Sequence, residues 1–385
     1  MKQYVKMIDG IGQSMAEIDI SRKYGIDYRL EKGRTSEIIS RLHPEKLELS
    51  VSEVIEETSD ARTFRLVSKN GYLPPFEAGQ YVNIFVEIDG VRTSRPYSIC
   101  SSPAQRAYYD ITVARIENGF VSDYFLDSVR AGDCFEANGP AGDFRYNPVF
   151  HGKKQVFLAG GSGITPFMSM IREALDSGSD RQIHLIYGSR TPESALFTAE
   201  LEDYAAKHVN FTWSLVVSEP GTGFDGRTGF IDAECIREIP GGPGGYMFYM
   251  CGPEVMCDFC RSQLDELGVP ARRIRREMFG TRQDIWNEPG WPESLRGDEV
   301  FTVDIGGGKK IKAVCGEPLL VALERAGVRV PVCCRSGECS LCRVKLVSGR
   351  VFQAKGVLLR HADEKYGYIH SCRSYPVSDL EIMLV

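Results

Sequence analysis

The sequence predicts a multidomain chain with three parts: an antiparallel β-barrel, a parallel α/β domain, and a small C-terminal domain of strands with one helix. Residues 47–148 hold short β-branched runs, such as "YVNIFVEI" and "YYDITVARI", separated by Gly, Pro and Asn turns. Residues 149–280 alternate apolar runs with helical stretches, which indicates buried parallel strands. Residues 298–385 begin with the strand-like "EVFTVDI" and contain one helical piece, "EPLLVALERAG".

Two further segments complete the predicted organisation. Residues 1–46 mix charges of both signs and are expected to form one or two short helices, as an extension outside the three domains. Residues 281–297, "TRQDIWNEPGWPESLRG", carry prolines and tryptophans between two domains, and this composition predicts a linker.

Composition excludes several classes of protein. The chain has 385 residues, of which 43% are hydrophobic and 25% charged, as in ordinary globular domains. Its net charge of −6 argues against a nucleic-acid-binding protein, which needs a basic surface. The first residues lack the apolar core of a signal peptide, and no apolar run approaches the roughly twenty residues that span a bilayer. We therefore expect a cytoplasmic protein, in which clustered cysteines act as ligands or reactive groups rather than disulfides.

The densest cysteine run is "CCRSGECSLC", which contains four of the twelve cysteines. Cys334, Cys339 and Cys342 follow the spacing C-x4-C-x2-C, and Cys372 follows after 29 intervening residues. Three thiolates on one tight loop with a distant fourth are typical of plant-type [2Fe-2S] ferredoxins. Small residues, Ser336, Gly337 and Ser340, would let the loop curl so that its N–H groups face the sulfurs.

Two other interpretations of these four cysteines stay open. A zinc site would more often show two CxxC pairs or nearby histidines, and the thiols could also be buried without any metal. Residues 298–385 nevertheless resemble a plant-type ferredoxin domain, and this resemblance implies a β-grasp fold. Cys333 precedes the loop and is interpreted as a structural residue.

A second cysteine pair, Cys257 and Cys260, forms a CxxC in "CGPEVMCDFCRSQL". A redox CxxC usually sits at a helix N-terminus that lowers the thiol pKa, whereas this pair falls inside a predicted helix. We therefore expect it to serve packing, with Val255, Met256 and Phe259 facing inward.

The glycine-rich turn "AGGSGITP" lies between a predicted strand and a predicted helix. Its glycines would let a pyrophosphate approach the backbone, and the helix N-terminus would attract the negative charge. Such turns also occur for packing alone, and this one does not match the G-x-G-x-x-G fingerprint. Four other motifs accompany it in order: "RPYSIC" and "ENGFVSDYF" before it, and "CGP" and "EMFG" after it.

This ordered set resembles the ferredoxin–NAD(P)+ reductase superfamily. With the ferredoxin-like segment, residues 47–385 resemble the phthalate dioxygenase reductase type of oxygenase reductase. The resemblance implies a flavin in the barrel, FAD with FMN as the alternative, and a nicotinamide nucleotide in the α/β domain. The implied flavin-binding residues are Arg95, Pro96, Tyr97 and Ser98, with Gly119, Val121 and Ser122 at the phosphate.

The resemblance also assigns residues to the nucleotide and to hydride transfer. Cys251, with Ser98, Glu277 and Phe279, would lie at the reacting rings and is therefore a candidate catalytic residue. These residues, and Tyr97, also have structural interpretations. Tyr97 and Ser98 could be ordinary strand residues, Cys251 could be an inert buried thiol, and Glu277 and Phe279 could only pack against the linker. The implied nucleotide-binding residues are Gly160, Gly161, Gly163, Thr165, Pro166, Cys251, Gly252 and Pro253.

The choice between NADH and NADPH depends on groups near the adenosine ribose. Arg190 would attract a 2′-phosphate, whereas Glu219, which follows Ser218, would repel it and could accept from a ribose hydroxyl. We expect NADH, with NADPH as the alternative.

The implied function is electron transfer: a hydride passes from NADH to flavin, and single electrons then pass through the cluster to a protein acceptor. That acceptor would be an oxygenase component or another metalloenzyme. The alternatives are a subunit like that serving dihydroorotate dehydrogenase, whose cysteine arrangement differs, ferredoxin-linked NAD+ reduction, and a non-enzymatic redox-sensing module. Residues 1–46 have no counterpart in oxygenase reductases, and they would either dock a partner or stabilise the barrel.

Overall fold

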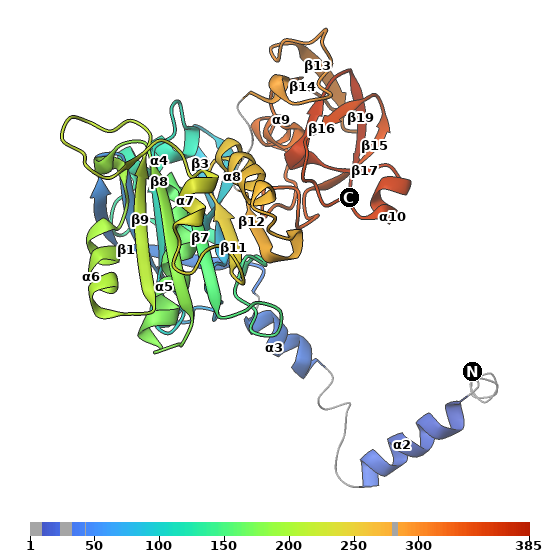
Figure 1. Ribbon diagram of the computed structural model, residues 1–385. Coiled ribbons are helices and arrows are strands. Elements are labelled where there is room, and N and C mark those ends of the chain that lie inside the picture. Colours follow the sequence, from blue (N-terminus) through green and yellow to red (C-terminus); the bar gives the residue numbers. More distant parts are fainter. Residues whose placement is uncertain (1–9, 24–32, 43, 279–283) are drawn as a thin grey trace. The chain divides into compact units, whose positions relative to one another are not determined.

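The computed structural model describes residues 10–23, 33–42, 44–278 and 284–385 (Figure 1). The chain divides into two compact units, 1–45 and 46–385, and each is described by itself. The first unit contains two helices, α2 (Ile11–Lys23) and α3 (Arg34–Leu42), in keeping with the one or two short helices expected here. Within these two helices no side chain is buried.

The second unit begins with a six-stranded antiparallel sheet, in the order β4-β3-β6-β1-β2-β5. Alternation of apolar and polar residues accounts for a sheet with one buried face. Along β1, the side chains of Leu47, Leu49 and Val51 point into the core, and the polar residues between them face outward. A pairing between Ile99 and Ile111 connects the end of β4 to β5 and closes the sheet. The strands are β1 (Leu47–Thr58), β2 (Ala61–Ser68), β3 (Tyr81–Ile88), β4 (Val91–Ser98), β5 (Tyr109–Ala114) and β6 (Cys134–Ala141).

A two-residue hairpin turn fixes the register of β3 against β4. Asp89 and Gly90 both have positive φ, 50° and 76°, as a type I′ turn requires. This register places Tyr81 opposite Ser98, at the end of β4 that carries the "RPYS" motif.

The next part is a six-stranded parallel sheet, in the order β10-β9-β8-β7-β11-β12. Its central strands are buried almost throughout, which accounts for their continuous apolar runs. The strands are β7 (Lys154–Gly160), β8 (Gln182–Ser189), β9 (Phe211–Val217), β10 (Arg227–Thr228), β11 (Met247–Cys251) and β12 (Ile274–Glu277), and the helices are α5 (Thr165–Asp176), α6 (Thr198–Lys207), α7 (Ala233–Arg237) and α8 (Glu254–Glu266).

The C-terminal part is a mixed five-stranded sheet, in the order β14-β13-β19-β15-β17, with a separate β16–β18 pair. Only β13 and β19 run parallel within that five-stranded sheet. The elements are β13 (Val300–Asp304), β14 (Lys310–Val314), β15 (Arg343–Ser348), β16 (Val351–Gln353), β17 (Tyr368–His370), β18 (Ser374–Pro376), β19 (Leu380–Leu384), α9 (Leu319–Arg325) and α10 (His361–Lys365). The predicted fold class, with a barrel, a parallel α/β part and a small C-terminal part, is confirmed.

Two local expectations differ from the structure. In α8 the inward-facing residues are Cys257, Cys260 and Leu264, whereas Val255 is 67% exposed and Phe259 38%. The cysteines are buried inside a helix as expected, and Met256 packs against the same cluster as predicted, but the inward orientation predicted for Val255 and Phe259 was wrong, because the small thiols occupy the buried face of this helix.

The predicted linker does more than connect domains. Ile285 and Trp291 are buried in one hydrophobic cluster with Cys315, Ala354 and Tyr375. This segment therefore packs on the C-terminal part, and the domain boundaries at 148, 280 and 297 remain predictions.

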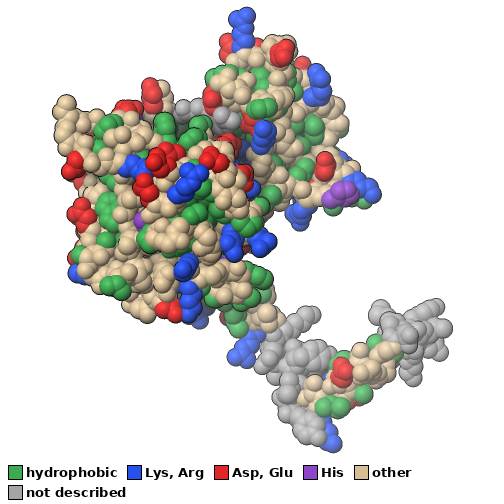
Figure 2. Space-filling view, in the orientation of Figure 1, with side chains coloured by type: hydrophobic (Ala, Val, Ile, Leu, Met, Phe, Trp, Pro, Cys, Tyr) green, Lys and Arg blue, Asp and Glu red, His purple; other side chains and the backbone are tan. Residues whose placement is uncertain are grey.

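The visible surface mixes charges of both signs. On the face shown in Figure 2, acidic and basic side chains are interspersed and form no continuous basic band. None of the helices in the described ranges is long and apolar enough to cross a bilayer.

Candidate redox site

The cysteine loop curls at two of the three small residues expected to permit this, Gly337 with φ 86° and Ser340 with φ 60°. Arg335, which was not among the predicted residues, also has a positive φ, 53°. A Cβ at Gly337 would lie 3.1 Å from Val357 and 3.2 Å from Arg373, so glycine is needed there. The curl directs two backbone N–H groups, those of Ser336 and Cys339, to the sulfur of Cys334 at 3.4 and 3.3 Å.

The four predicted ligands come together as two pairs. Cys334 pairs with Cys339, and Cys342 pairs with Cys372, each through a thiol–thiol hydrogen bond. These interactions lower the pKa of Cys334 and of Cys342 and raise the pKa of their partners, Cys339 and Cys372. In each pair one thiol is therefore favoured as the thiolate, the form that binds metal.

The pairing fits two irons better than one. Among the described residues, no three His, Cys, Asp or Glu side chains gather around a single point as one metal ion would require. Two separate pairs are the donor set of a [2Fe-2S] cluster, in which each iron takes two protein thiolates. The zinc interpretation is therefore not supported by this arrangement.

The "RPYS" residues lie at the end of β4. Ser98 is buried, and its Oγ has no hydrogen-bond partner within the described part of the chain. Such an atom normally has a partner, so a missing ligand group is the natural explanation. Burial, with the nearby charge of Arg335, lowers the pKa of Arg95 to about 10, and no carboxylate in the described residues forms an ion pair with Arg95. A desolvated guanidinium and an unpaired hydroxyl fit the phosphate and the ring edge of a flavin.

Gly119 caps the helix α4 (Phe120–Ser128), as the motif predicts. A Cβ on Gly119 would lie 2.0 Å from Ser122 Oγ and 2.8 Å from the carbonyl oxygen of Ile116, so only glycine fits. Val121 and Ser122 are buried in the first turn of this helix. The first turn leaves backbone N–H groups free for an anion such as the flavin phosphate.

The nucleotide motifs share one edge of the parallel sheet. Gly160, Cys251 and Glu277 end the neighbouring strands β7, β11 and β12, and ligands of such sheets bind at the carboxyl ends. Gly163 is required for packing here, since its Cβ would lie 2.3 Å from the carbonyl oxygen of Cys251. Gly161 has φ 52°, and it leads into α5, where Thr165 is buried and Pro166 follows in the first turn.

Cys251 and Glu277 are directly opposite each other in the pairing of β11 with β12. Burial raises the pKa of both groups well above the ordinary values, and Glu277 adds to the effect on Cys251. The raised pKa favours the protonated form of the Glu277 carboxyl, whose Oε2 has no partner among the described residues. Phe279, the remaining predicted catalytic residue, lies outside the described residues. Gly252 and Pro253 follow Cys251 and lead into α8.

Tyr81, which the sequence analysis overlooked, lies where all three parts meet. Its ring carbons lie 3.0 and 3.1 Å from the position of a Cβ on Gly142, and Glu277 Oε1 lies 3.8 Å from the same position. Cys333 donates to the Tyr81 hydroxyl at 3.8 Å, and Tyr81 packs with Cys333 and Cys334. Tyr81 thus pairs with Ser98 in the β3–β4 register and packs with the cysteine loop, and its ring lies near the Gly142 position that Glu277 also approaches. No local pattern marks Tyr81, because as the first residue of a strand it looks like any other strand aromatic.

Arg190 and Glu219 also come together, as two neighbouring strand ends would predict. They follow β8 and β9, and their charged groups are 4.0 Å apart. Both side chains are more than two thirds exposed, so the pair contributes little to stability. Each side chain is free to turn toward a ribose.

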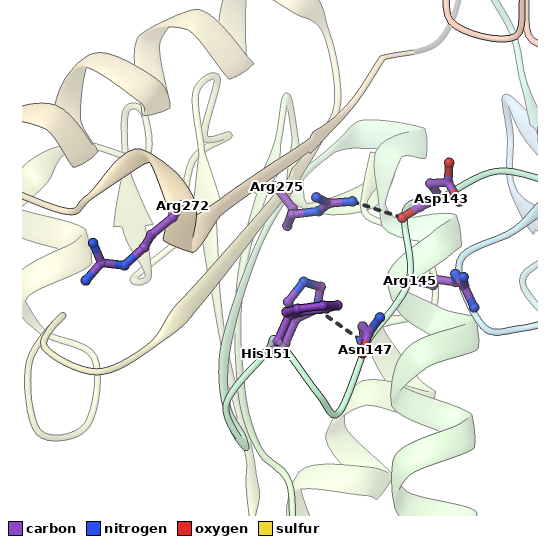
Figure 3. A pocket seen from close by; sticks show the side chains of 7 residues that line it. Asp143, Arg145, Asn147, His151, Arg272 and Arg275 are labelled. Carbon is purple, nitrogen blue, oxygen red and sulfur yellow. Dashed lines mark hydrogen bonds between the residues drawn. The ribbon is translucent and has the colours of Figure 1, made fainter.

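A hollow of about 480 Å³ lies beside β12, away from the motifs above (Figure 3). Its charged groups largely have partners: Arg275 donates to the Asp143 carbonyl at 3.2 Å, and Arg145 pairs with Glu77. His151 accepts from the Asn147 N–H at 3.0 Å and forms a 2.7 Å hydrogen bond with the Tyr249 hydroxyl. None of the predicted site residues lines this hollow.

Comparison with family models gives three matches along the chain. Residues 46–146 match an oxidoreductase FAD-binding domain, residues 157–262 an oxidoreductase NAD-binding domain, and residues 303–377 a 2Fe-2S iron-sulfur cluster binding domain. The predicted cofactors are the ones that these three domains bind.

Similar proteins cover nearly the same length. The chain is 30% identical to the glycine betaine monooxygenase reductase subunit of Pseudomonas aeruginosa, over 86% of this chain and 93% of that protein. It is 30% identical to the NADH oxidoreductase HCR of Escherichia coli, over 86% and 96%. Among solved structures, a phthalate dioxygenase reductase, a modular structure for electron transfer from pyridine nucleotides to [2Fe-2S], matches with a TM-score of 0.65, 28% identity, and coverage of 88% and 97%.

Proposed function

This chain belongs to the family of NAD(P)H-dependent flavin and [2Fe-2S] electron-transfer reductases, and from that premise we propose how its own residues perform the reaction and what it serves. It takes electrons from NADH and delivers them one at a time to a metalloenzyme partner, with an oxygenase component as the first candidate. The main support for this proposal is the position of Tyr81. It pairs with Ser98 in the strand register, packs with the cysteine loop, and lies near the Gly142 position that Glu277 also approaches.

The flavin supplies, when bound, the conversion of a two-electron donor into a one-electron donor. Arg95 binds its phosphate, together with the first turn of α4 at Gly119, Val121 and Ser122. Ser98 directs its unpaired hydroxyl to the ring edge, with Pro96 and Tyr97 packing beside it. These groups are held on a closed barrel, so they position the ring with little reorganisation.

At the nucleotide edge, Gly160, Gly161, Thr165 and Pro166 accept the pyrophosphate at the start of α5. Gly163 serves by letting this turn approach β11 closely, which places Cys251, Gly252 and Pro253 beside the nicotinamide. Glu277 contributes a carboxyl whose burial raises its pKa and so favours the protonated form, which can donate a hydrogen bond. Burial likewise favours the neutral thiol of Cys251.

Cys334, Cys339, Cys342 and Cys372 would hold the cluster as its thiolate ligands. The preference for NADH is supported by Glu219, whose carboxylate disfavours a 2′-phosphate. The cytoplasm is the proposed location, since cluster ligands must stay reduced to bind iron. Sedimentation of the native protein with the cytosolic fraction checks this.

The test combines turnover with spectroscopy on the same sample. Purified protein loaded with FAD and iron should oxidise NADH with ferricyanide, and NADH should also generate the EPR signal of a reduced [2Fe-2S] cluster. A sample that carries both cofactors yet shows no EPR signal after NADH would contradict the proposed route. Turnover with ferricyanide in the same sample distinguishes this reductase from a redox-sensing module.

A further inference from the structure

The hydroxyl of Thr93 connects the cysteine loop to the strand that carries the flavin motif. Thr93 of β4 is buried, and its hydroxyl donates to Glu324 Oε2 of α9 at 2.9 Å. The Thr93 hydroxyl oxygen also accepts a hydrogen bond from Arg95 Nη1 at 2.9 Å and another from Arg335 Nη2 at 3.0 Å. A hydroxyl has one hydrogen to donate and two lone pairs, so its bonding capacity is full. Through this single atom, the strand of the flavin motif is joined to the residue that follows the predicted ligand Cys334.

The charges around Thr93 do not balance. Arg335 forms a buried ion pair with Glu324, and the two side chains are 7% and 10% exposed. Arg95 lies close to both of these groups. The positive charge of Arg335 disfavours the charged form of Arg95, and the negative charge of Glu324 favours it. Two guanidinium groups therefore share one carboxylate in a desolvated place, where an unmatched charge is costly. An anion at Arg95 would remove the imbalance.

Arg335 is also held in an unusual backbone conformation. Its φ of 53° is uncommon for a residue other than glycine, and such conformations persist only where surrounding contacts maintain them. The contacts available are those with Glu324, Thr93 and Ser94, the last at 3.4 Å. A second attachment lies just before the loop, where the side-chain amides of Asn83 and Asn138 both donate to the Val332 carbonyl, at 3.2 and 3.1 Å.

We propose that the Thr93 hydroxyl couples the flavin phosphate site to the cluster loop, so that an anion bound at Arg95 stabilises the docked position of that loop. The proposal rests on the proposed function for the place of the flavin phosphate. It goes beyond that function by assigning Thr93, Glu324 and Arg335 as positioning residues. Without the anion, repulsion between Arg95 and Arg335 weakens the hold of α9 and the loop on β4. By thermodynamic linkage, a loosened loop must weaken anion binding by the same factor.

Hydrogen exchange of the full-length, iron-loaded protein tests the coupling without relying on turnover. Flavin is stripped and then restored, and the exchange of amides in residues 319–340 is followed by mass spectrometry. Addition of FAD should slow this exchange about fivefold or more, a typical lower limit for allosteric coupling. Inorganic pyrophosphate should slow it in part, and riboflavin, which lacks phosphate, should not.

Two matched threonine variants isolate the hydroxyl. Thr93→Val should abolish the FAD-dependent slowing and raise the dissociation constant of FAD by the same factor, whereas Thr93→Ser should behave as wild type. Thr63→Val serves as the control, because Thr63 is an equally buried barrel threonine that bonds within the barrel, to Thr112 at 2.8 Å and to Glu57 at 2.6 Å. Its FAD-dependent slowing should be retained. If Thr93→Val does not fold, Glu324→Gln replaces it, and that variant should also lose the slowing.

Three results would overturn the coupling. One is unchanged exchange in residues 319–340 when FAD binds to the wild-type protein. Another is equal slowing by riboflavin and FAD, which would assign the effect to ring packing rather than charge. The last is FAD-dependent slowing that persists in Thr93→Val. Failure of FAD to bind at all is a different outcome, seen in the binding titration, and it would contradict the proposed flavin site itself.

Discussion

Glu277 lies directly opposite Cys251, at the point where the parallel strands β12 and β11 both end. Both side chains are buried, and burial raises the pKa of each well above its ordinary value. Burial therefore favours the uncharged form of both groups at the carboxyl edge of the sheet.

The protonated state of Glu277 predicts a pH-dependent cost to stability. Its carboxyl keeps its proton in the folded protein, whereas in the unfolded chain it loses the proton above the ordinary pKa of 4.5. Above that pH the unfolded state binds fewer protons than the folded state, so this group lowers stability as pH rises. Glu277→Gln removes the titration and should raise the midpoint of thermal unfolding at pH 8, with a smaller gain at pH 5. The exposed Glu202→Gln is the control, and an equal gain at both pH values would argue against a buried neutral Glu277.

The paired thiols predict which cysteines the cluster needs. Cys372→Ser should lose the cluster, because it leaves one iron with a single thiolate, as judged by iron content and the EPR spectrum after dithionite. Cys333→Ala should keep the wild-type iron content and EPR spectrum, because the Cys333 thiol contacts the Tyr81 hydroxyl and is not one of the predicted ligands. Retention of a wild-type spectrum in Cys372→Ser would show that the ligand assignment is wrong.

Arg95 should decide flavin retention. Loss of a charged hydrogen bond costs about 1.5–3 kcal/mol, so Arg95→Ala should bind flavin roughly tenfold to a hundredfold more weakly. The variant should emerge from gel filtration with its iron and without its flavin. Arg92→Ala on the same strand is the matched control, since Arg92 pairs with Glu136 at 2.8 Å and is 38% exposed. Stoichiometric flavin in Arg95→Ala would count against the motif, and chromatography of released flavin distinguishes FAD from FMN.

Glu219 should set the nucleotide preference. In Glu219→Arg the carboxylate beside Arg190 becomes a second cation, which favours a 2′-phosphate. The ratio of kcat/KM for NADPH to that for NADH should rise by on the order of tenfold, about 1.4 kcal/mol. Glu202→Arg, an exposed charge reversal on α6, should leave the ratio unchanged. If both variants keep the wild-type ratio, Glu219 does not face the ribose.

The N-terminal unit should be dispensable for the chemistry. No side chain in the described parts of α2 and α3 is buried, and Ile38 and Ile39 of α3 are 50% and 53% exposed. Removal of residues 1–45 should therefore spare NADH oxidation with ferricyanide. If this unit docks a partner, transfer to that partner alone should fail. A truncated protein that folds but no longer reduces ferricyanide would reject the docking role.

How far the sequence could lead depended on the range of each interaction. The spacing of Cys334, Cys339 and Cys342 predicted a metal loop because three ligands within nine residues must lie close together. The glycine turn at Gly160 was equally local, so the strand and the helix that it joins formed where expected. The inward orientation predicted for Val255 and Phe259 in α8 was wrong. Whether Cys257 or Phe259 faces the core depends on how the helix packs against other elements, which the helix sequence does not specify.

The sequence by itself determined the three-part architecture, the cofactors and the order of the motifs, since each depends on residues near one another in the chain. Only the tertiary structure decided how the parts connect. It brought Tyr81 against Cys333 and placed Thr93 between Arg95 and Arg335, across more than 230 residues. It also made Ile285 and Trp291 part of a core rather than of a linker. These contacts leave no periodic or motif signal, because burial and hydrogen bonding between distant segments depend on the packed fold and not on neighbours in sequence.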